Sequence, residues 1–198
     1  NFFTIPFLFF ILVKYLNQNS LNNFFIGWVY GFGYFLSNLY WISNSLRFDE
    51  NFDNLIIFSI FFIPFLLSIF YGLFSFSLKF FNIKMNFSSI FIFSLIFSIF
   101  EYLRGTIFGG FPWNLISFSL IEFTSSLQLL SIIGTYSFNL IILTFYCLPI
   151  IILFKISSTR KFITTSIAVL IIFANSYYGD NRIKNIEQLD KKEFSVST

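Results

Sequence analysis

The sequence predicts an all-α integral membrane protein, built as a polytopic bundle of about six transmembrane helices. Its 198 residues are 57% hydrophobic and only 11% charged, and the mean hydropathy is +0.80. Such a composition cannot give a soluble globule a polar surface. The apolar residues also gather in runs near the roughly 17 to 25 residues that cross a hydrocarbon core of about 30 Å. These observations favour a membrane bundle.

Six apolar runs approach the length of a membrane span. Pro64 and Pro149 fall inside two of them, and we expect kinks there, which a bilayer tolerates where neighbouring helices satisfy the freed carbonyls. The first run is short and carries Lys14 near its end, where a lysine stem can reach the headgroups. The expected spans cover residues 2–16, 24–43, 55–80, 87–103, 134–154 and 162–178.

The charges between the runs predict the orientation of the bundle, because short connections rich in lysine and arginine stay in the cytoplasm. The first, third and fifth connections are basic, and the second and fourth are acidic or mixed. This alternation places both ends of the chain on the periplasmic side. Because the chain begins with Asn1, we expect a further span before it. The basic residues are Lys14, Lys79, Lys84, Lys155, Arg160 and Lys161.

The C-terminal residues differ in composition from the rest of the chain. Residues 179–198 are polar and charged, which predicts a transmembrane helical domain at 1–178 and a periplasmic linker at 179–198. The segment KKEFSVS, residues 191–197, is interpreted as the entry to a first β-strand of a soluble domain on the same side. A disordered tail is the alternative.

Several classes of chemistry are excluded by composition. The chain has no histidine and one cysteine, so histidine acid–base catalysis, a histidine-rich metal site and an internal disulfide are ruled out. The net charge of +3 is small and dispersed, so we expect no nucleic-acid partner. We also expect no metal and no cofactor. Cys147 lies in the middle of an apolar run, where the thiolate is disfavoured, so we interpret it as packing.

One polar stretch interrupts this pattern, EYLRGTIFGGFPWNL at residues 101–115. Glu101 and Arg104 are three residues apart at the outer end of an expected helix, so they share a face and can form an ion pair. Either the pair neutralises itself, or Arg104 meets a phospholipid phosphate while Glu101 fixes its orientation. The following glycines and Pro112 end the helix, and Trp113 is typical of an interfacial loop.

The same stretch carries a family resemblance. EYLRGTIFGGFPWNLISFSL looks like the E-[FWY]-L-R-G-x-x-x-x-G-F-P-W signature of the apolipoprotein N-acyltransferase family, and GWVYGFGYFLSNLYWISNSL, residues 27–46, resembles the span that precedes it in that family. The order and spacing of the two segments agree with the family. The resemblance implies that the six runs correspond to the family's second to seventh spans.

The resemblance implies an enzyme that N-acylates the N-terminal diacylglyceryl-cysteine of lipoproteins, the last step of their maturation in the bacterial inner membrane. The donor would be a phospholipid and the acceptor a diacylated apolipoprotein. The family works through a thioester on the cysteine of a Glu-Lys-Cys triad, in a periplasmic nitrilase-like domain. That domain would begin beyond Thr198, so we expect no catalytic residue in this chain and no activity from it alone.

The residues carried over from the motifs would handle substrate at a lateral portal. Each has a simpler structural interpretation. Gly27 and Gly31 fit close helix packing, and Tyr40 and Trp41 fit an interfacial aromatic belt. Asn38, Asn139 and Asn175 are expected to bond between helices. The substrate-binding candidates are Glu101, Arg104, Gly110, Phe111, Pro112 and Trp113, with Gly31, Tyr40 and Trp41 as weaker members.

Two other functions stay open at this stage. A stand-alone, lipid-binding membrane scaffold would have the same spans without a catalytic domain. A small transporter subunit would need a polar track through several spans, whereas the runs contain no carboxylate apart from Glu101 at a helix end.

Overall fold

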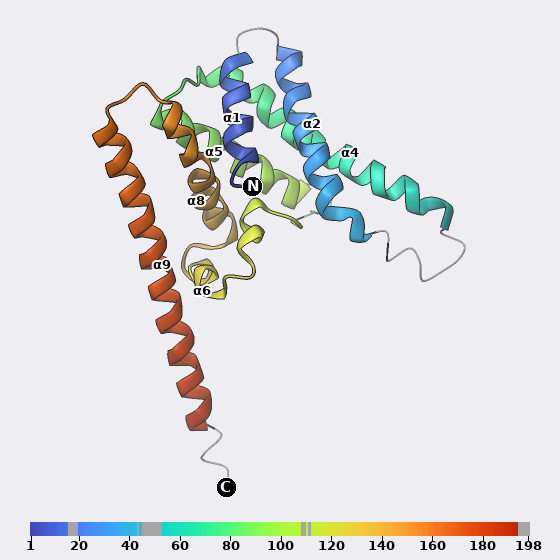
Figure 1. Ribbon diagram of the computed structural model, residues 1–198. Helices are drawn as coiled ribbons and strands as arrows, with labels where there is room; N and C mark the ends of the chain where they lie inside the picture. The colour runs from blue at the N-terminus through green and yellow to red at the C-terminus, as the bar shows by residue number, and fades with distance from the viewer. Residues whose placement is uncertain (16–19, 43, 45–52, 108–109, 111, 194–198) are drawn as a thin grey trace.

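The computed structural model describes residues 1–15, 20–42, 44, 53–107, 110 and 112–193, and within them every regular element is helical (Figure 1). The prediction of an all-α chain is therefore confirmed for the described residues. The elements are α1 Thr4–Tyr15, α2 Ser20–Leu39, η1 Tyr40–Ile42, α4 Asp53–Ser77, η3 Leu78–Phe81, α5 Phe87–Thr106, η5 Ile116–Leu120, α6 Thr124–Leu127, α7 Leu130–Ile133, α8 Thr135–Cys147, η6 Leu148–Leu153 and α9 Ser158–Glu193.

The predicted count of six spans is not confirmed. Among the described helices, 4 are long and apolar enough to cross a membrane. α1 has 12 residues, about 18 Å of helix, which is shorter than a hydrocarbon core of about 30 Å. α2 has 20 residues but carries Asn22, Asn23 and Asn38, which lower its hydropathy. The four segments are Leu55–Phe81, Phe87–Thr106, Thr135–Leu153 and Ser158–Ile186.

The helices run up and down, so that alternate connections lie at the same end of the bundle. Figure 1 shows the end of α1, the end of α4 with η3, and the turn between η6 and α9 at one end of the molecule. These are the places where the sequence carries its basic connections. The alternation of the predicted topology is therefore present, while the side of the membrane that this end faces stays a prediction.

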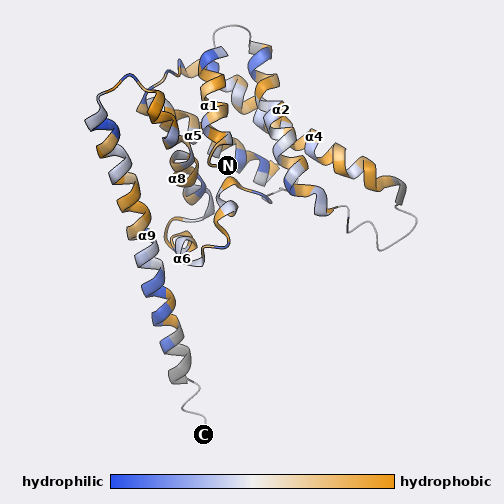
Figure 2. Cartoon of the chain, in the orientation of Figure 1, coloured by the Kyte–Doolittle hydropathy of each residue, from blue (hydrophilic) through white to orange (hydrophobic). Residues whose placement is uncertain are grey.

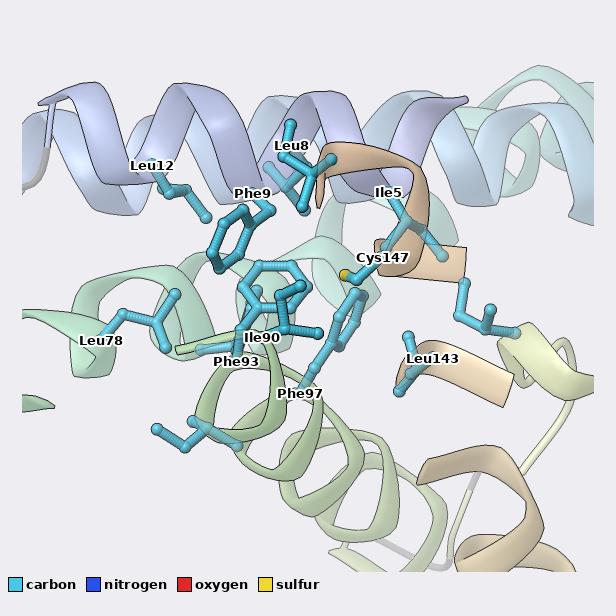
Figure 3. Packing of buried hydrophobic residues seen from close by; sticks show 14 of the residues in the cluster. Ile5, Leu8, Phe9, Leu12, Leu78, Ile90, Phe93, Phe97, Leu143 and Cys147 are labelled. Carbon is cyan, nitrogen blue, oxygen red and sulfur yellow. The ribbon is translucent and has the colours of Figure 1, made fainter. Parts of the chain in front are cut away.

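The interior of the bundle is packed mainly with aromatic rings. Phe74 stacks on Phe97 with ring centroids 4.4 Å apart, and Phe9 meets Phe93 edge-on at 5.3 Å. Cys147 is fully buried in the same cluster, with its sulfur among apolar side chains (Figure 3). The interpretation of Cys147 as a packing residue is confirmed.

Glycines allow α2 and α4 to approach closely. A Cβ added at Gly31 would lie 2.8 Å from Cβ of Tyr71, so a larger residue would push the two helices apart. A Cβ at Gly27 would clash with Ser75 on α4, whereas one at Gly33 would meet nothing within 4 Å. Gly27 and Gly31 therefore belong to the helix interface, as their spacing predicts.

α9 stands apart from the other helices (Figure 1). Only 6% of its most apolar window is buried, against 50% for α5. It is attached near its start, where Lys161 Nζ donates to Ile152 O at 2.6 Å. It is attached again beside α6, where Asn175 Nδ2 donates to Ser126 O at 3.1 Å. Between these two attachments Thr164, Ile167 and Ala168 line a hollow shared with α8, and most of the other side chains are exposed.

Most of the predicted linker, residues 179–193, forms the polar end of α9. The helix continues without a break past residue 178 to Glu193. Figure 2 shows a hydrophilic first turn, a largely hydrophobic middle and a hydrophilic stretch after it. The interpretation of residues 191–197 as the start of a strand is wrong for residues 191–193, which are helical; residues 194–198 lie outside the described part. The domain boundary at residue 178 stays a prediction.

Candidate functional site

The C-terminal end of α5 carries a buried ion pair. Glu101 and Arg104 are 0% and 1% exposed, and Arg104 Nη2 lies 3.6 Å from Glu101 Oε1. The helix ends at Thr106, shortly before the glycines that were expected to end it. The predicted ion pair is confirmed, although it lies inside the bundle and not at its surface.

The carboxylate of Glu101 is bound by side chains from two further helices. Tyr71 of α4 donates its hydroxyl to Oε1 at 2.9 Å. Asn139 of α8 donates its side-chain amide to Oε2. Tyr71 and Asn139 are themselves fully buried. We call Tyr71, Glu101, Arg104 and Asn139 the polar cluster; a buried charge persists in such a place only when it is paired and hydrogen-bonded.

The guanidinium of Arg104 faces the protein, not the membrane. Its Nη1 donates to the backbone carbonyl of Trp113 at 2.8 Å, and its Cζ lies 5.0 Å from the ring centroid of Phe35 on α2. The first contact is charge-assisted and the second is a cation–π contact. Binding of a phospholipid phosphate by Arg104 stays a prediction, and it would require the loop that covers this side chain to move.

That loop, residues 112–117, is held at several backbone positions. Tyr34 donates its hydroxyl to Asn114 O at 3.0 Å, and Asn114 Nδ2 donates to Asn38 O at 3.1 Å. Ser117 N donates to Asn139 Oδ1 at 2.9 Å. Residues of α2, α5 and α8 thus hydrogen-bond to polar groups of this loop.

A tryptophan of this loop meets a tryptophan from a distant part of the sequence. Trp41 of η1 and Trp113 have ring centroids 5.7 Å apart, and they are 41% and 55% exposed. We call them the aromatic pair. Tyr40, next to Trp41 in η1, is also exposed. The two sequence segments that carry the family resemblance thus come together at one place.

The other predicted site residues lie around this place. Gly110 has φ of 77°, and a Cβ there would lie 2.5 Å from Gly105 O, so only glycine fits. Pro112 is exposed, and Gly31 packs against Tyr71. Phe111 lies outside the described residues. Across the described residues, no group of three or more histidine, cysteine, aspartate or glutamate side chains could hold a metal.

Comparison with known proteins identifies the family. Residues 1–148 match a family model described as the apolipoprotein N-acyltransferase N-terminal domain. The chain belongs to the apolipoprotein N-acyltransferase family. It is 32% identical over 184 residues to the apolipoprotein N-acyltransferase of Rickettsia typhi, covering 91% of this chain and 36% of that protein.

Other relatives carry the same name. The chain is 32% identical over 162 residues to the apolipoprotein N-acyltransferase of Rhodopseudomonas palustris, covering 80% of this chain and 30% of that protein. It is 37% identical over 119 residues to the one of Rickettsia bellii, covering 60% and 23%. The chain therefore spans about a third or less of the length of these N-acyltransferases.

Sequence reasoning missed part of the site in this N-acyltransferase family member. Tyr71, Tyr34 and Phe35 were not singled out, because each is one aromatic residue among many. Asn139 was expected only to bond between helices; it does, and it also contacts the loop. Asn175 bonds to α6 as expected, whereas Asn38 donates its side chain within its own helix, to Tyr34 O. A polar side chain in an apolar helix was the available signal for Asn139.

Proposed function

We propose that this chain is the membrane domain of a phospholipid-dependent apolipoprotein N-acyltransferase of the bacterial inner membrane. Such an enzyme transfers an acyl chain to the N-terminal diacylglyceryl-cysteine of a lipoprotein. The observation that carries the proposal is the aromatic pair. Trp41 and Trp113, one from each segment of the family resemblance, lie in contact, and three helices hold the loop that carries Trp113. The family match supports the same assignment.

The aromatic pair and Tyr40 are proposed to contact the substrates. Tryptophan and tyrosine rings are amphipathic and favour the depth of lipid headgroups. Their faces also attract ammonium groups, which occur on an ethanolamine headgroup and on a protein's free amino terminus. Gly110 and Pro112 would shape the turn that presents Trp113, and Phe111 is included by its place in the motif. Glu101 and Arg104 would act from inside, through the loop.

The reaction itself is proposed to need residues beyond this chain. In the first step a cysteine thiol attacks a phospholipid acyl ester, which forms a thioester and releases a lysophospholipid. In the second step the lipoprotein's amino group attacks that thioester, which forms an amide and regenerates the thiol. Cys147 cannot serve because it is fully buried among apolar side chains. A Glu-Lys-Cys triad in a periplasmic nitrilase-like domain would supply the chemistry, and neither step requires a cofactor.

An acyl-transfer assay tests the proposal. The whole gene product that contains this chain is produced in membranes and supplied with a phospholipid carrying a labelled acyl chain and a synthetic diacylated lipopeptide. We expect the peptide to gain the mass of one acyl chain on its amino group, measured by mass spectrometry. The absence of any transfer would contradict the proposed function.

The aromatic pair can be tested in the same assay. We expect Trp113→Ala to lower acyl transfer about tenfold, as a lost ring contact of roughly 1.4 kcal/mol would, while the protein still inserts. Ile121→Ala is the matched control, because Ile121 is also exposed in the segment after α5 but has no aromatic ring and lies outside both segments of the family resemblance. Equal transfer by wild type and Trp113→Ala would remove this site from the mechanism.

A further inference from the structure

The polar cluster costs desolvation free energy that apolar side chains in the same place would not cost. Its four side chains come from α4, α5 and α8, and all are at least 99% buried. Replacing a buried ion pair by apolar side chains of similar volume is often neutral or stabilising. A buried pair therefore needs another reason to exist, and fixing one particular arrangement of the chain is the best-attested one.

The contacts of the cluster indicate what it fixes. Arg104 Nη1 contacts the carbonyl of Trp113, and Asn139 Oδ1 accepts the backbone N–H of Ser117. These two points lie at either end of the segment 113–117, on the inner side of the loop. The side chain of Trp113 is on the opposite, exposed side, against Trp41. The cluster thus contacts the loop backbone at Trp113, which carries the exposed ring, and at Ser117, near the start of η5.

Asn139 connects the charge to the loop. Its Nδ2 faces the Glu101 carboxylate, and its Oδ1 faces the Ser117 N–H. With the amide turned over, an oxygen would face the carboxylate and an NH₂ would face the N–H, so both contacts would be lost. Glu101 therefore sets the orientation of Asn139, and Asn139 sets the position of Ser117.

Tyr71 completes the arrangement from the other side. Its hydroxyl binds Glu101 Oε1 at 2.9 Å, the oxygen that also faces Arg104. Its ring lies 5.0 Å from Phe35 and 5.9 Å from Tyr34, measured between centroids. Both oxygens of the Glu101 carboxylate thus accept a hydrogen bond, Oε1 from Tyr71 and Oε2 from Asn139. Arg104 faces Oε1 with its Nη2 and donates to Trp113 O with its Nη1.

We propose that Asn139 and Tyr71 are positioning residues for acyl transfer, which hold the loop 112–117 so that Trp113 stays against Trp41. They touch no substrate and act through the loop backbone. This inference rests on the proposed function, in that the aromatic pair contacts the substrates. Its structural part, the hold on the loop, stands on the hydrogen bonds alone.

Hydrogen exchange in the whole gene product tests the structural part. We expect Asn139→Ala to raise exchange of the Ser117 amide and its neighbours at least tenfold, with exchange in α5 unchanged. A merely structural role would raise exchange in α5 as well. Asn175→Ala is the matched control: it also removes a hydrogen bond from an asparagine side chain to the backbone of another element, here Ser126 O in α6, and its effect should stay near α6.

Kinetics test the functional part. For Asn139→Ala we expect the KM for a phospholipid donor to rise about tenfold, with kcat within about twofold of wild type. Tyr71→Phe keeps the ring and removes only the hydroxyl, so it decides the question if Asn139→Ala does not accumulate; we expect its KM to rise about threefold. Wild-type exchange and wild-type KM in both variants would overturn the inference.

The two proposals fail in different ways. If the wild-type gene product transfers no acyl chain, the proposed function fails, whatever the exchange data show. If the wild type is active and the loop of Asn139→Ala exchanges as in the wild type, the proposed function stands and the positioning role is overturned.

Discussion

α5 and α9 are both apolar helices long enough to cross a membrane, yet they lie in opposite environments. Half of the apolar window of α5 is buried, 50%, against 6% for α9. α5 turns Glu101, Arg104 and several serines toward the interior, whereas α9 turns isoleucine, leucine and phenylalanine outward. In a membrane protein apolar side chains are as stable against lipid tails as they are in the core. The polar side chains, not the apolar ones, therefore mark the interior.

The strongest test of this comparison separates the two charges of α5. Glu101→Leu or Arg104→Met alone leaves one buried charge unpaired, and we expect each to lower the free energy of unfolding by about 3 to 5 kcal/mol. The double variant removes both charges and should lose much less than the sum. Unfolding in detergent, followed as a double-mutant cycle, measures the difference. Additive losses would show that the two side chains act independently.

A smaller effect is expected at the interface of α2 and α4. Gly31→Ala places a methyl group 2.8 Å from Cβ of Tyr71, which we expect to lower the free energy of unfolding by about 1 to 3 kcal/mol through overpacking. Gly33→Ala is the matched control, because a Cβ there meets nothing within 4 Å and alanine favours a helix. Thermal unfolding of the two variants compares them, and equal midpoints would refute the close contact.

The smallest effect is expected on the outward side of α9. Leu170 is 66% exposed, so Leu170→Ala should change the free energy of unfolding by no more than about 0.5 kcal/mol. Phe97, fully buried in α5, provides the contrast, since Phe→Ala in a packed core typically loses about 3 to 5 kcal/mol. A large loss at Leu170 would mean that α9 packs more tightly than its exposure indicates.

The sequence was sufficient for the features that depend on composition and local order. Run length predicted the long apolar helices, but neither the short helical elements of residues 116–133 nor the continuation of α9 to Glu193. The glycines and Pro112 predicted an end of α5 close to the observed one at Thr106, and the motif predicted the family. The count of six spans is not confirmed, because α1 has 12 residues and the asparagines of α2 lower its hydropathy.

The partners of the buried charges could not be predicted in the same way. Tyr71 is one of 10 tyrosines, and nothing local distinguishes it from Tyr40, which is exposed. What places Tyr71 next to Glu101 is the close approach of α2 to α4 at Gly31 and the packing of α4 on α5, which are properties of the folded bundle. The same holds for Trp41 and Trp113, which lie far apart in sequence.

The continuity of α9 has a mechanical consequence. Its 36 residues form a single helix about 54 Å long, well beyond a hydrocarbon thickness of about 30 Å. If such a stiff rod pivots near Lys161, a tilt of about 5° displaces its other end by about 4 Å, from the rise per residue.

That displacement would not be confined to α9. A Cβ at Gly179 would collide with the backbone of Ser125, so the rod lies directly against α6 and is also bonded to it through Asp180. α6 in turn belongs to the segment that leads from the loop 112–117 to Asn139 in α8. A force applied to the polar end of α9 would thus act first on α6, within the stretch of chain that joins the loop 112–117 to α8.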